Sequence, residues 1–173
     1  MIDQMVLANI MLDIFAIVLS FIPVVYTLND QRYRQRLNQY FLGVSVSNIF
    51  MIAGDLADWL FQEITTPIQA VTLTIFSVIF YVASAFVLYF FARYMETYLK
   101  LSGRRRAWYL GSVCAVCAVQ IFFALISPFT GAIFTVTEHG YQRGALFLIS
   151  QLVPLYCYLL FTATVILYRK SLS

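Results

Sequence analysis

Long apolar stretches separated by short polar segments dominate the amino-acid sequence. A transmembrane helix needs about 20 predominantly apolar residues, because the hydrocarbon core of a bilayer is about 30 Å thick. Five stretches meet this requirement: residues 5–28, 40–60, 68–98, 108–127 and 145–168. The pattern predicts an all-α, polytopic membrane bundle of five transmembrane helices, with residues 1–173 forming one domain.

Lysine and arginine occur almost entirely in alternate polar segments of the chain. The segments that carry them contain Arg32, Arg34, Arg36, Lys100, Arg104, Arg105, Arg106, Arg169 and Lys170. Arg143 is the one cation of the intervening segments. Because cytoplasmic loops of membrane proteins retain lysine and arginine, residues 30–38 and 99–106 are predicted to be cytosolic. Residues 61–67 and 128–144 are then external, with the N-terminus outside and the C-terminus inside.

The composition supports this class and narrows the range of functions. With 62% hydrophobic and 11% charged residues and a mean hydropathy of +0.83, the chain is not expected to form a soluble domain. The net charge of +3 follows from the topology and gives no reason to expect a nucleic-acid partner. The first four residues lack the basic stretch of a signal peptide, so the first apolar stretch is expected to remain as a membrane helix. The expected location is the cell (plasma or inner) membrane, with the lipid bilayer as a partner.

Two segments carry predictions beyond the number of helices. Residues 68–98 are longer than a bilayer requires at 1.5 Å per residue, so this helix is predicted to project into the cytosol until Gly103 ends it. Residues 128–144 form the one substantial outer loop, in which Gly140 can take the positive φ of a tight turn. A short β-hairpin and an irregular polar loop are both compatible with this segment.

Polar residues gather in the outer half of the predicted bundle. An ionisable side chain inside a membrane costs about 2.5–3.5 kcal/mol on insertion scales, and no lysine or arginine lies within a span at the depth of Asp13 and Asp55. These carboxyl groups therefore are protonated, face water or await a cation. Polar stripes on all five helices converge at this depth, which predicts an outward-facing cavity covered by the 128–144 loop. The candidate ligand-binding residues are Asn9, Asp13, Asn48, Asp55, Trp59, Ser77, Tyr81, Gln120, Tyr141, Arg143 and Gln151.

The sequence offers no arrangement typical of an enzyme. It contains no nucleophile–base pattern, phosphate-binding loop or zinc-ligand spacing, and His139 is its one histidine. We therefore expect no catalytic activity, no metal site and no cofactor. Cys114 and Cys117 form a C-x-x-C pair, for which a membrane thiol oxidase is one interpretation. Such an enzyme needs a second, exposed pair to relay electrons, so packing of small residues between helices is the favoured interpretation.

Three short motifs resemble a known kind of membrane region. They are Asn48-x6-Asp55-x3-Trp59, the segment Ser-Pro-Phe-Thr-Gly-Ala-Ile-Phe at 127–134, and Tyr-Gln-Arg-Gly at 141–144. Together they resemble the N-terminal multi-helix membrane sensor region that precedes diguanylate cyclase or histidine kinase domains in bacteria, Firmicutes especially. The resemblance covers essentially the whole chain and gives weight to Asp55, Trp59, Tyr141, Arg143 and Gly144. The sequence departs from the pattern at position 145, which is Ala where Pro is expected.

The resemblance implies a sensory bundle whose last helix feeds a cytosolic output domain or a separate partner protein. We therefore expect a membrane signal-sensing domain that binds a small extracellular ligand, cationic or amine-bearing, and a homodimer is favoured over a monomer. The alternative is a small transporter or channel subunit that uses Asp13 and Asp55 as an ion or proton relay. Transport needs access from both sides, whereas the cytosolic halves of the first, fourth and fifth helices carry few polar residues. A structural assembly partner, whose polar stripes only form interhelical hydrogen bonds, is a third alternative.

Overall fold

The computed structural model describes residues 4–30 and 35–168. Within these ranges the chain forms five helices and two short strands. The elements are α1 (Gln4–Asn29), α2 (Arg36–Leu60), α3 (Pro67–Tyr98), α4 (Gly103–Thr130), β1 (Phe134–Thr137), β2 (Gly140–Arg143) and α5 (Phe147–Tyr168). All five helices are long and apolar enough to cross a membrane. The chain is thus a helical bundle of the multi-pass membrane type, as the apolar stretches predicted.

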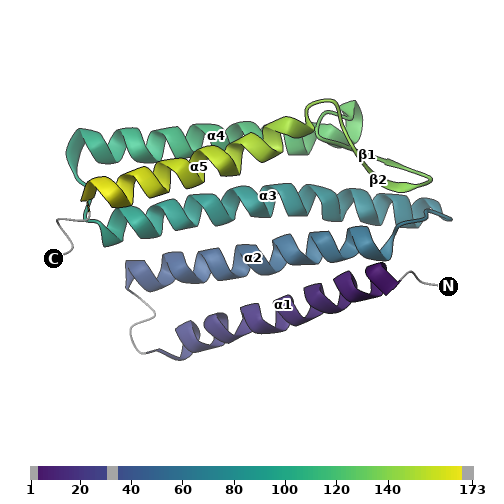
Figure 1. Ribbon diagram of the computed structural model, residues 1–173, viewed down its shortest axis with the longest axis horizontal. Helices are drawn as coiled ribbons and strands as arrows, with labels where there is room; N and C mark the ends of the chain where they lie inside the picture. The colour runs from purple at the N-terminus through teal and green to yellow at the C-terminus, as the bar shows by residue number, and fades with distance from the viewer. Residues whose placement is uncertain (1–3, 31–34, 169–173) are drawn as a thin grey trace.

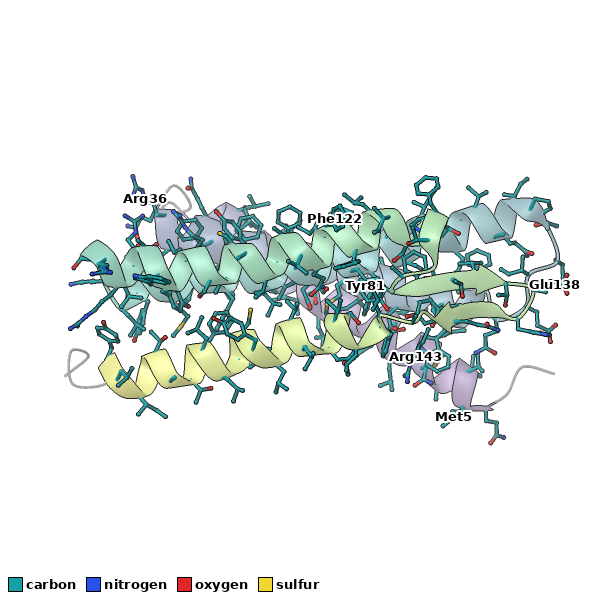
Figure 2. The ribbon with its side chains drawn as sticks, turned by 90° about the horizontal axis from the view of Figure 1, so that it is seen from above. Met5, Arg36, Tyr81, Phe122, Glu138 and Arg143 are labelled. Atoms are coloured by element: carbon teal, nitrogen blue, oxygen red, sulfur yellow. The ribbon has the colours of Figure 1, made fainter. Side chains whose placement is uncertain are left out.

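The helices lie side by side along the long axis of the molecule (Figure 1). Helix α1 packs chiefly on α2, and α2 packs on α3. Helices α4 and α5 both contact the other side of α3, which makes α3 the central element. One end of the bundle, here called the hairpin end, carries β1, β2 and the α2–α3 loop. The opposite end, here called the basic end, carries Arg36, and Figure 2 shows Arg36 and Glu138 at these two ends.

Large apolar side chains cover much of the outer surface. Only Thr27 is buried in α1, and Phe129 at the hairpin end of α4 is 89% exposed. Phe122 likewise extends outward from α4 in Figure 2. A surface of this kind is stable when lipid chains surround it, because the backbone polar groups of a helix are already satisfied internally.

Helices α2 and α3 approach each other closely at small residues of α2. A Cβ atom added at Gly43 would lie 2.7 Å from the ring of Phe90, and one added at Gly54 would lie 2.7 Å from Cβ of Phe80. Ser47 is buried between these two glycines. Small residues at such spacing let two helix backbones pack tightly in a membrane, where van der Waals contact is a main attraction between helices.

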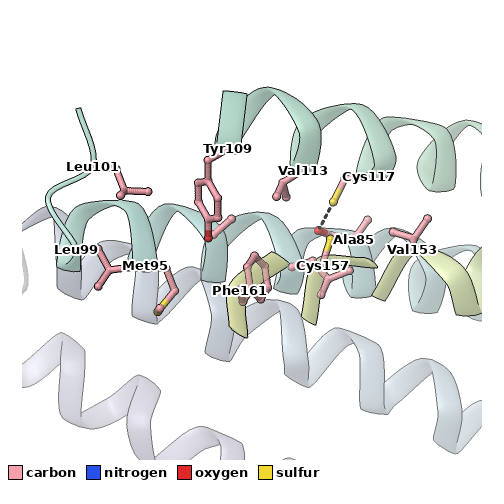
Figure 3. Packing of buried hydrophobic residues seen from close by; sticks show 12 residues of the cluster. Ala85, Met95, Leu99, Leu101, Tyr109, Val113, Cys117, Val153, Cys157 and Phe161 are labelled. Carbon is pink, nitrogen blue, oxygen red and sulfur yellow. Dashed lines mark hydrogen bonds between the residues drawn. The ribbon is translucent and has the colours of Figure 1, made fainter. Parts of the chain in front are cut away.

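Apolar side chains fill the space between α3, α4 and α5 in the half of the bundle nearer the basic end (Figure 3). Ala85, Val113 and Cys157 are fully buried there. The thiol of Cys117 donates a hydrogen bond to the carbonyl oxygen of Ala85 at 3.5 Å, which Figure 3 marks with a dashed line. Cys114 is a free, exposed thiol. The two cysteines of the C-x-x-C pair thus point to different surroundings, and Cys117 packs as a small core residue.

Helix α3 does not continue to Gly103, and that prediction was wrong. The helix ends at Tyr98, and the left-handed residue that follows is Lys100, with φ 51°. The amide of Leu101 bonds back to the carbonyl of Glu96 at 3.1 Å, which closes the end of the helix. Gly103, also at positive φ, instead begins α4. Helix α4 therefore includes the arginine run that the sequence analysis placed in a loop.

Strands β1 and β2 form an antiparallel pair in which Phe134 lies opposite Arg143 and Val136 opposite Tyr141. Gly140 takes a φ of 76° in the turn, and a Cβ atom there would lie 2.8 Å from the carbonyl oxygen of Phe61. The amide of Ile64 also donates to the carbonyl of Glu138 at 3.0 Å. The tip of the hairpin is therefore packed against the α2–α3 loop.

The apolar stretch predicted a helix that starts at residue 145. Helix α5 instead begins two residues later, at Phe147. The intervening residues form a turn in which the amide of Leu146 bonds the carbonyl of Ala132 at 2.7 Å. A Cβ atom at Gly144 would lie 2.2 Å from the carbonyl oxygen of Gly131. The link between β2 and α5 is thus pressed against the end of α4, where only glycine fits.

Candidate functional site: a cavity below the hairpin

A cavity of about 230 Å³ lies between α2, α3, β2 and the start of α5. Its lining residues are Gly54, Asp55, Asp58, Ser77, Phe80, Tyr81, Tyr141, Arg143, Phe147 and Gln151. The predicted site residues among them are Asp55, Ser77, Tyr81, Tyr141, Arg143 and Gln151. Four separate elements contribute to the lining, so the cavity exists only when the hairpin is packed on the helices.

One wall of the cavity is aromatic. Tyr81 is 3% exposed, and its ring stacks on Phe134 with centroids 5.8 Å apart. Phe134 also stacks on Tyr141 at 6.1 Å. The hydroxyl groups of Tyr81 and Tyr141 are hydrogen bonded to each other. Burial raises the pKa of the Tyr141 phenol above its usual range, so this hydroxyl is neutral at physiological pH.

A second part of the lining is acidic. Asp55 and Asp58 lie three residues apart on α2, so their side chains are neighbours on one face of the helix. The carboxylate of Asp55 is exposed and that of Asp58 is half-buried. Within the described part of the chain, neither forms a salt bridge. Two carboxyl groups thus face the cavity with their hydrogen-bonding capacity available for a ligand.

Arg143 provides the one positive charge among the lining residues. Its guanidinium lies over the ring of Phe147, 4.6 Å from the centroid, and its side chain is exposed. A cation over an aromatic face is held by the ring quadrupole. With two carboxylates and one guanidinium, the lining has an excess of negative charge and can accept a cation.

The remaining predicted residues lie outside this lining. Asp13 is on α1, where one carboxylate oxygen is buried without a hydrogen-bond partner among the described residues. Asn9 is half-buried on the same helix. Asn48 donates a hydrogen bond to Oγ of Ser20 at 3.1 Å, so it joins α2 to α1.

Two further candidates support the cavity or flank it. The amide nitrogen of Gln120 donates to the carbonyl of Tyr81 at 3.0 Å and to Oγ of Ser84 at 2.6 Å. Gln120 is 1% exposed, so it fixes the backbone behind Tyr81 from α4. Trp59 is half-buried near the hairpin end of α2, outside the lining residues.

The cover of the cavity is fixed to α4 by Ser127. Its hydroxyl accepts a hydrogen bond from the amide of Ile133 at 2.9 Å and donates one to the carbonyl of Phe123 at 2.6 Å. Ile133 is fully buried next to Phe134 in the same apolar cluster. The segment that leads into β1 is thus held in place from below, and this fixes the position of the hairpin over the cavity.

Sequence reasoning missed four lining residues: Gly54, Asp58, Phe80 and Phe147. Helical spacing contained a signal for three of them. Asp58 follows Asp55 by three positions, Phe80 follows Ser77 by three, and Phe147 precedes Gln151 by four. Gly54 had no such signal, because its role depends on how closely α3 approaches.

No protein-family model, no curated protein and no solved structure matches this chain. The resemblance to bacterial membrane sensor regions therefore stays an expectation.

Proposed function

We propose that this protein is a membrane signal-sensing domain that binds a small, amine-bearing cation in the cavity below the hairpin. The observation that carries the proposal is that the carboxyl groups of Asp55 and Asp58 line the same cavity as an aromatic wall. Aromatic rings and carboxylates together are the surroundings that protein sites offer to ammonium groups. The volume of about 230 Å³ suits a ligand of a few heavy atoms.

The proposed orientation places the hairpin end outside the cell. The basic end carries Arg36 and Arg104–Arg106, and cytoplasmic ends of membrane proteins are rich in arginine and lysine. The N-terminus is then external, the C-terminus is cytosolic, and the short β-hairpin is an outer feature. In this orientation the cavity is accessible to extracellular ligands.

Helix α5 is the element through which binding is relayed in this proposal. It contributes Gln151 to the cavity and ends at the basic end. It packs much less extensively on α3 and α4 than α2 packs on α3, and elements with few packing contacts move at lower cost. A ligand that bridges Asp55 on α2 and Gln151 on α5 favours one position of α5 over another, which is the requirement for a ligand-driven shift.

The receiver of this movement is a cytosolic output domain, such as a diguanylate cyclase or histidine kinase domain, or a separate partner protein. A homodimer would couple the movement to the spacing of two paired α5 helices. The transporter alternative draws on Asp13, one carboxylate oxygen of which is buried without a hydrogen-bond partner among the described residues. Against transport, the apolar cluster around Val113 and Phe161 fills the space between the cavity and the basic end.

The proposal is tested by ligand-induced thermal stabilisation of the purified full chain in detergent. The probes are methylammonium, tetramethylammonium, putrescine and spermidine, with sodium chloride at matched ionic strength as reference. We expect at least one organic cation to raise the melting temperature of the unaltered protein. The double variant Asp55→Asn/Asp58→Asn should lose this shift.

Glu63→Gln is the matched control, because it removes a carboxylate from the same end of the bundle but outside the cavity lining. It should keep the full shift. Failure of all four cations to stabilise the unaltered protein would contradict the proposal. An equal loss of the shift in Glu63→Gln would mean that the stabilisation by organic cations comes from the surface charge of the protein in general and not from binding in the cavity. Uptake of the bound cation into sealed vesicles would favour the transporter alternative.

A further inference from the structure

A second cavity, of about 320 Å³, lies at the basic end between α2, α3 and α4. Its lining residues are Arg36, Tyr40, Arg93, Glu96, Thr97, Lys100, Leu101 and Arg106. Four of these side chains are cations and one is a carboxylate, so the lining carries a net charge of about +3 at neutral pH. This excess of positive charge favours binding of an anion with more than one negative charge. The cavity shares no lining residue with the cavity below the hairpin.

Glu96 organises two of the arginines. It is 7% exposed, and its Oε1 lies 2.8 Å from Nε of Arg106 on α4. Its other oxygen lies 3.8 Å from Nε of Arg93, one turn earlier on α3. A single buried carboxylate thus holds guanidinium groups from two helices at the cavity, as fixed donors rather than as mobile surface chains.

Arg93 is held from a third direction by α2. Its Nη2 donates to the hydroxyl of Tyr40 at 2.6 Å, and its guanidinium lies over the Tyr40 ring at 5.1 Å. Its Nε is buried and has no hydrogen-bond acceptor among the described residues. The nearest carboxylate oxygen, Oε2 of Glu96 at 3.8 Å, lies beyond hydrogen-bond distance from this Nε. An anionic oxygen bound in the cavity would supply the missing acceptor.

Lys100 reaches the lining through an unfavourable backbone conformation. Its φ of 51° is left-handed, and it is the one non-glycine residue with positive φ in the described ranges. Glycine is the usual residue after a helix end, because a Cβ atom in this conformation crowds the backbone. Strained residues of this kind cluster at functional sites. Here the lysine adds an ammonium group to the cavity that glycine would lack.

Exposed aromatic residues at the basic end indicate that this cavity lies at the level of lipid headgroups. Tyr98 is 51% exposed and Trp108 is 69% exposed at the same end of the bundle. Exposed tyrosine and tryptophan are enriched where a membrane protein passes from hydrocarbon to water. Arginines donate paired hydrogen bonds to phosphate oxygens, and basic pockets between transmembrane helices bind anionic headgroups. We propose that this cavity binds the phosphate headgroup of an anionic membrane lipid.

The test compares lipids that share acyl chains and differ in charge. Native mass spectrometry of the full chain in detergent would measure binding of phosphatidylglycerol, and of phosphatidylcholine with the same chains. We expect phosphatidylglycerol to bind at least about tenfold more tightly, the ratio that corresponds to one charge-assisted hydrogen bond. Similar affinity for the two lipids would overturn the proposal. Glycerol 3-phosphate is the soluble arm, and equal affinity for it would reassign the cavity to a free phosphorylated solute.

Lys100→Gly is the decisive variant, because it removes the ammonium group and also relieves the left-handed backbone. It should weaken binding of phosphatidylglycerol by about fivefold to tenfold while keeping or raising the melting temperature. Arg105→Gln is the matched control, since Arg105 is a cation of the same segment that donates to the hydroxyl of Tyr168 instead of lining this cavity. It should change the affinity by less than about twofold. Retained affinity in Lys100→Gly, or an equal loss in Arg105→Gln, would contradict the assignment.

Discussion

The hydroxyl groups of Tyr81 and Tyr141 form a hydrogen bond that joins the middle of α3 to strand β2. Phe134 of β1 stacks on both tyrosine rings. Both strands of the hairpin are therefore attached to α3 at one place, directly beside the two carboxyl groups of α2. Because both tyrosines line the cavity, the same contact shapes the candidate binding site and holds its cover.

The tyrosine pair predicts a measurable coupling energy. Tyr81→Phe and Tyr141→Phe should each lower the free energy of unfolding by about 1–2 kcal/mol, because each leaves the other hydroxyl without this partner. The double variant should cost clearly less than the sum of the two, since no buried hydroxyl then remains unpaired. Thermal or denaturant unfolding in detergent gives the three values for a double-mutant cycle.

Tyr156→Phe is the matched control for this cycle, because Tyr156 is a partly exposed tyrosine of α5 outside the cavity lining. It should change the stability by less than about 0.5 kcal/mol. Strictly additive effects of Tyr81→Phe and Tyr141→Phe would show that the two hydroxyl groups act independently.

The proposed orientation gives a second prediction, which concerns accessibility on intact cells. In a background with Cys114→Ser, Cys117→Ala and Cys157→Ala, a single cysteine at His139→Cys should react with an impermeant thiol reagent. A single cysteine at Ser102→Cys should react only after the cells are opened. Both positions are exposed in the structure, so access to the reagent decides the result. The reverse labelling pattern would place the hairpin end in the cytosol.

The helices could be predicted from the sequence because a bilayer fixes the length and polarity of a span. The predicted apolar stretch of α3 begins one residue after the observed helix and ends with it at Tyr98, whereas the predicted continuation of the helix to Gly103 was wrong. Cavity residues on helices, such as Asp55, Tyr81 and Gln151, could also be predicted, because helical periodicity shows which residues share a face. Lining residues that depend on one helix face alone were therefore accessible to sequence reasoning.

Features that depend on how two segments pack against each other could not be predicted from helical periodicity. Asp13 shares the depth of Asp55, but α1 packs chiefly on α2, so Asp13 lies beside the cavity rather than in its lining. The stacking of Phe134 on Tyr81 depends on how the hairpin is placed, which the sequence of the loop does not specify. The left-handed turn at Lys100, which closes the end of α3, was missed because Gly103, three residues later, is the stronger local signal for a helix end.

The contact between α2 and α3 beside the cavity gives the last prediction. A methyl group at Gly54 would lie 2.7 Å from Cβ of Phe80 and 2.8 Å from the carbonyl oxygen of Phe76. These atoms belong to the backbone and the root of a side chain, so Gly54→Ala must push α2 away from α3. We expect a loss of about 1–3 kcal/mol of stability, as for other overpacked contacts. We also expect weaker stabilisation by organic cations, because Asp55 moves with the helix.

Gly43→Ala is the control within the same helix pair. Its added methyl group would also lie 2.7 Å from its neighbours, but these are Cδ1 and Cγ of the Phe90 side chain, and none of the three nearest atoms belongs to the backbone. Position 43 is also nearer the basic end, far along α2 from the cavity lining. Gly43→Ala should therefore cost less stability than Gly54→Ala and leave the cation-induced shift in melting temperature intact. An equal loss of that shift in both variants would mean that general loosening of the α2–α3 contact, rather than the position of Asp55, controls binding.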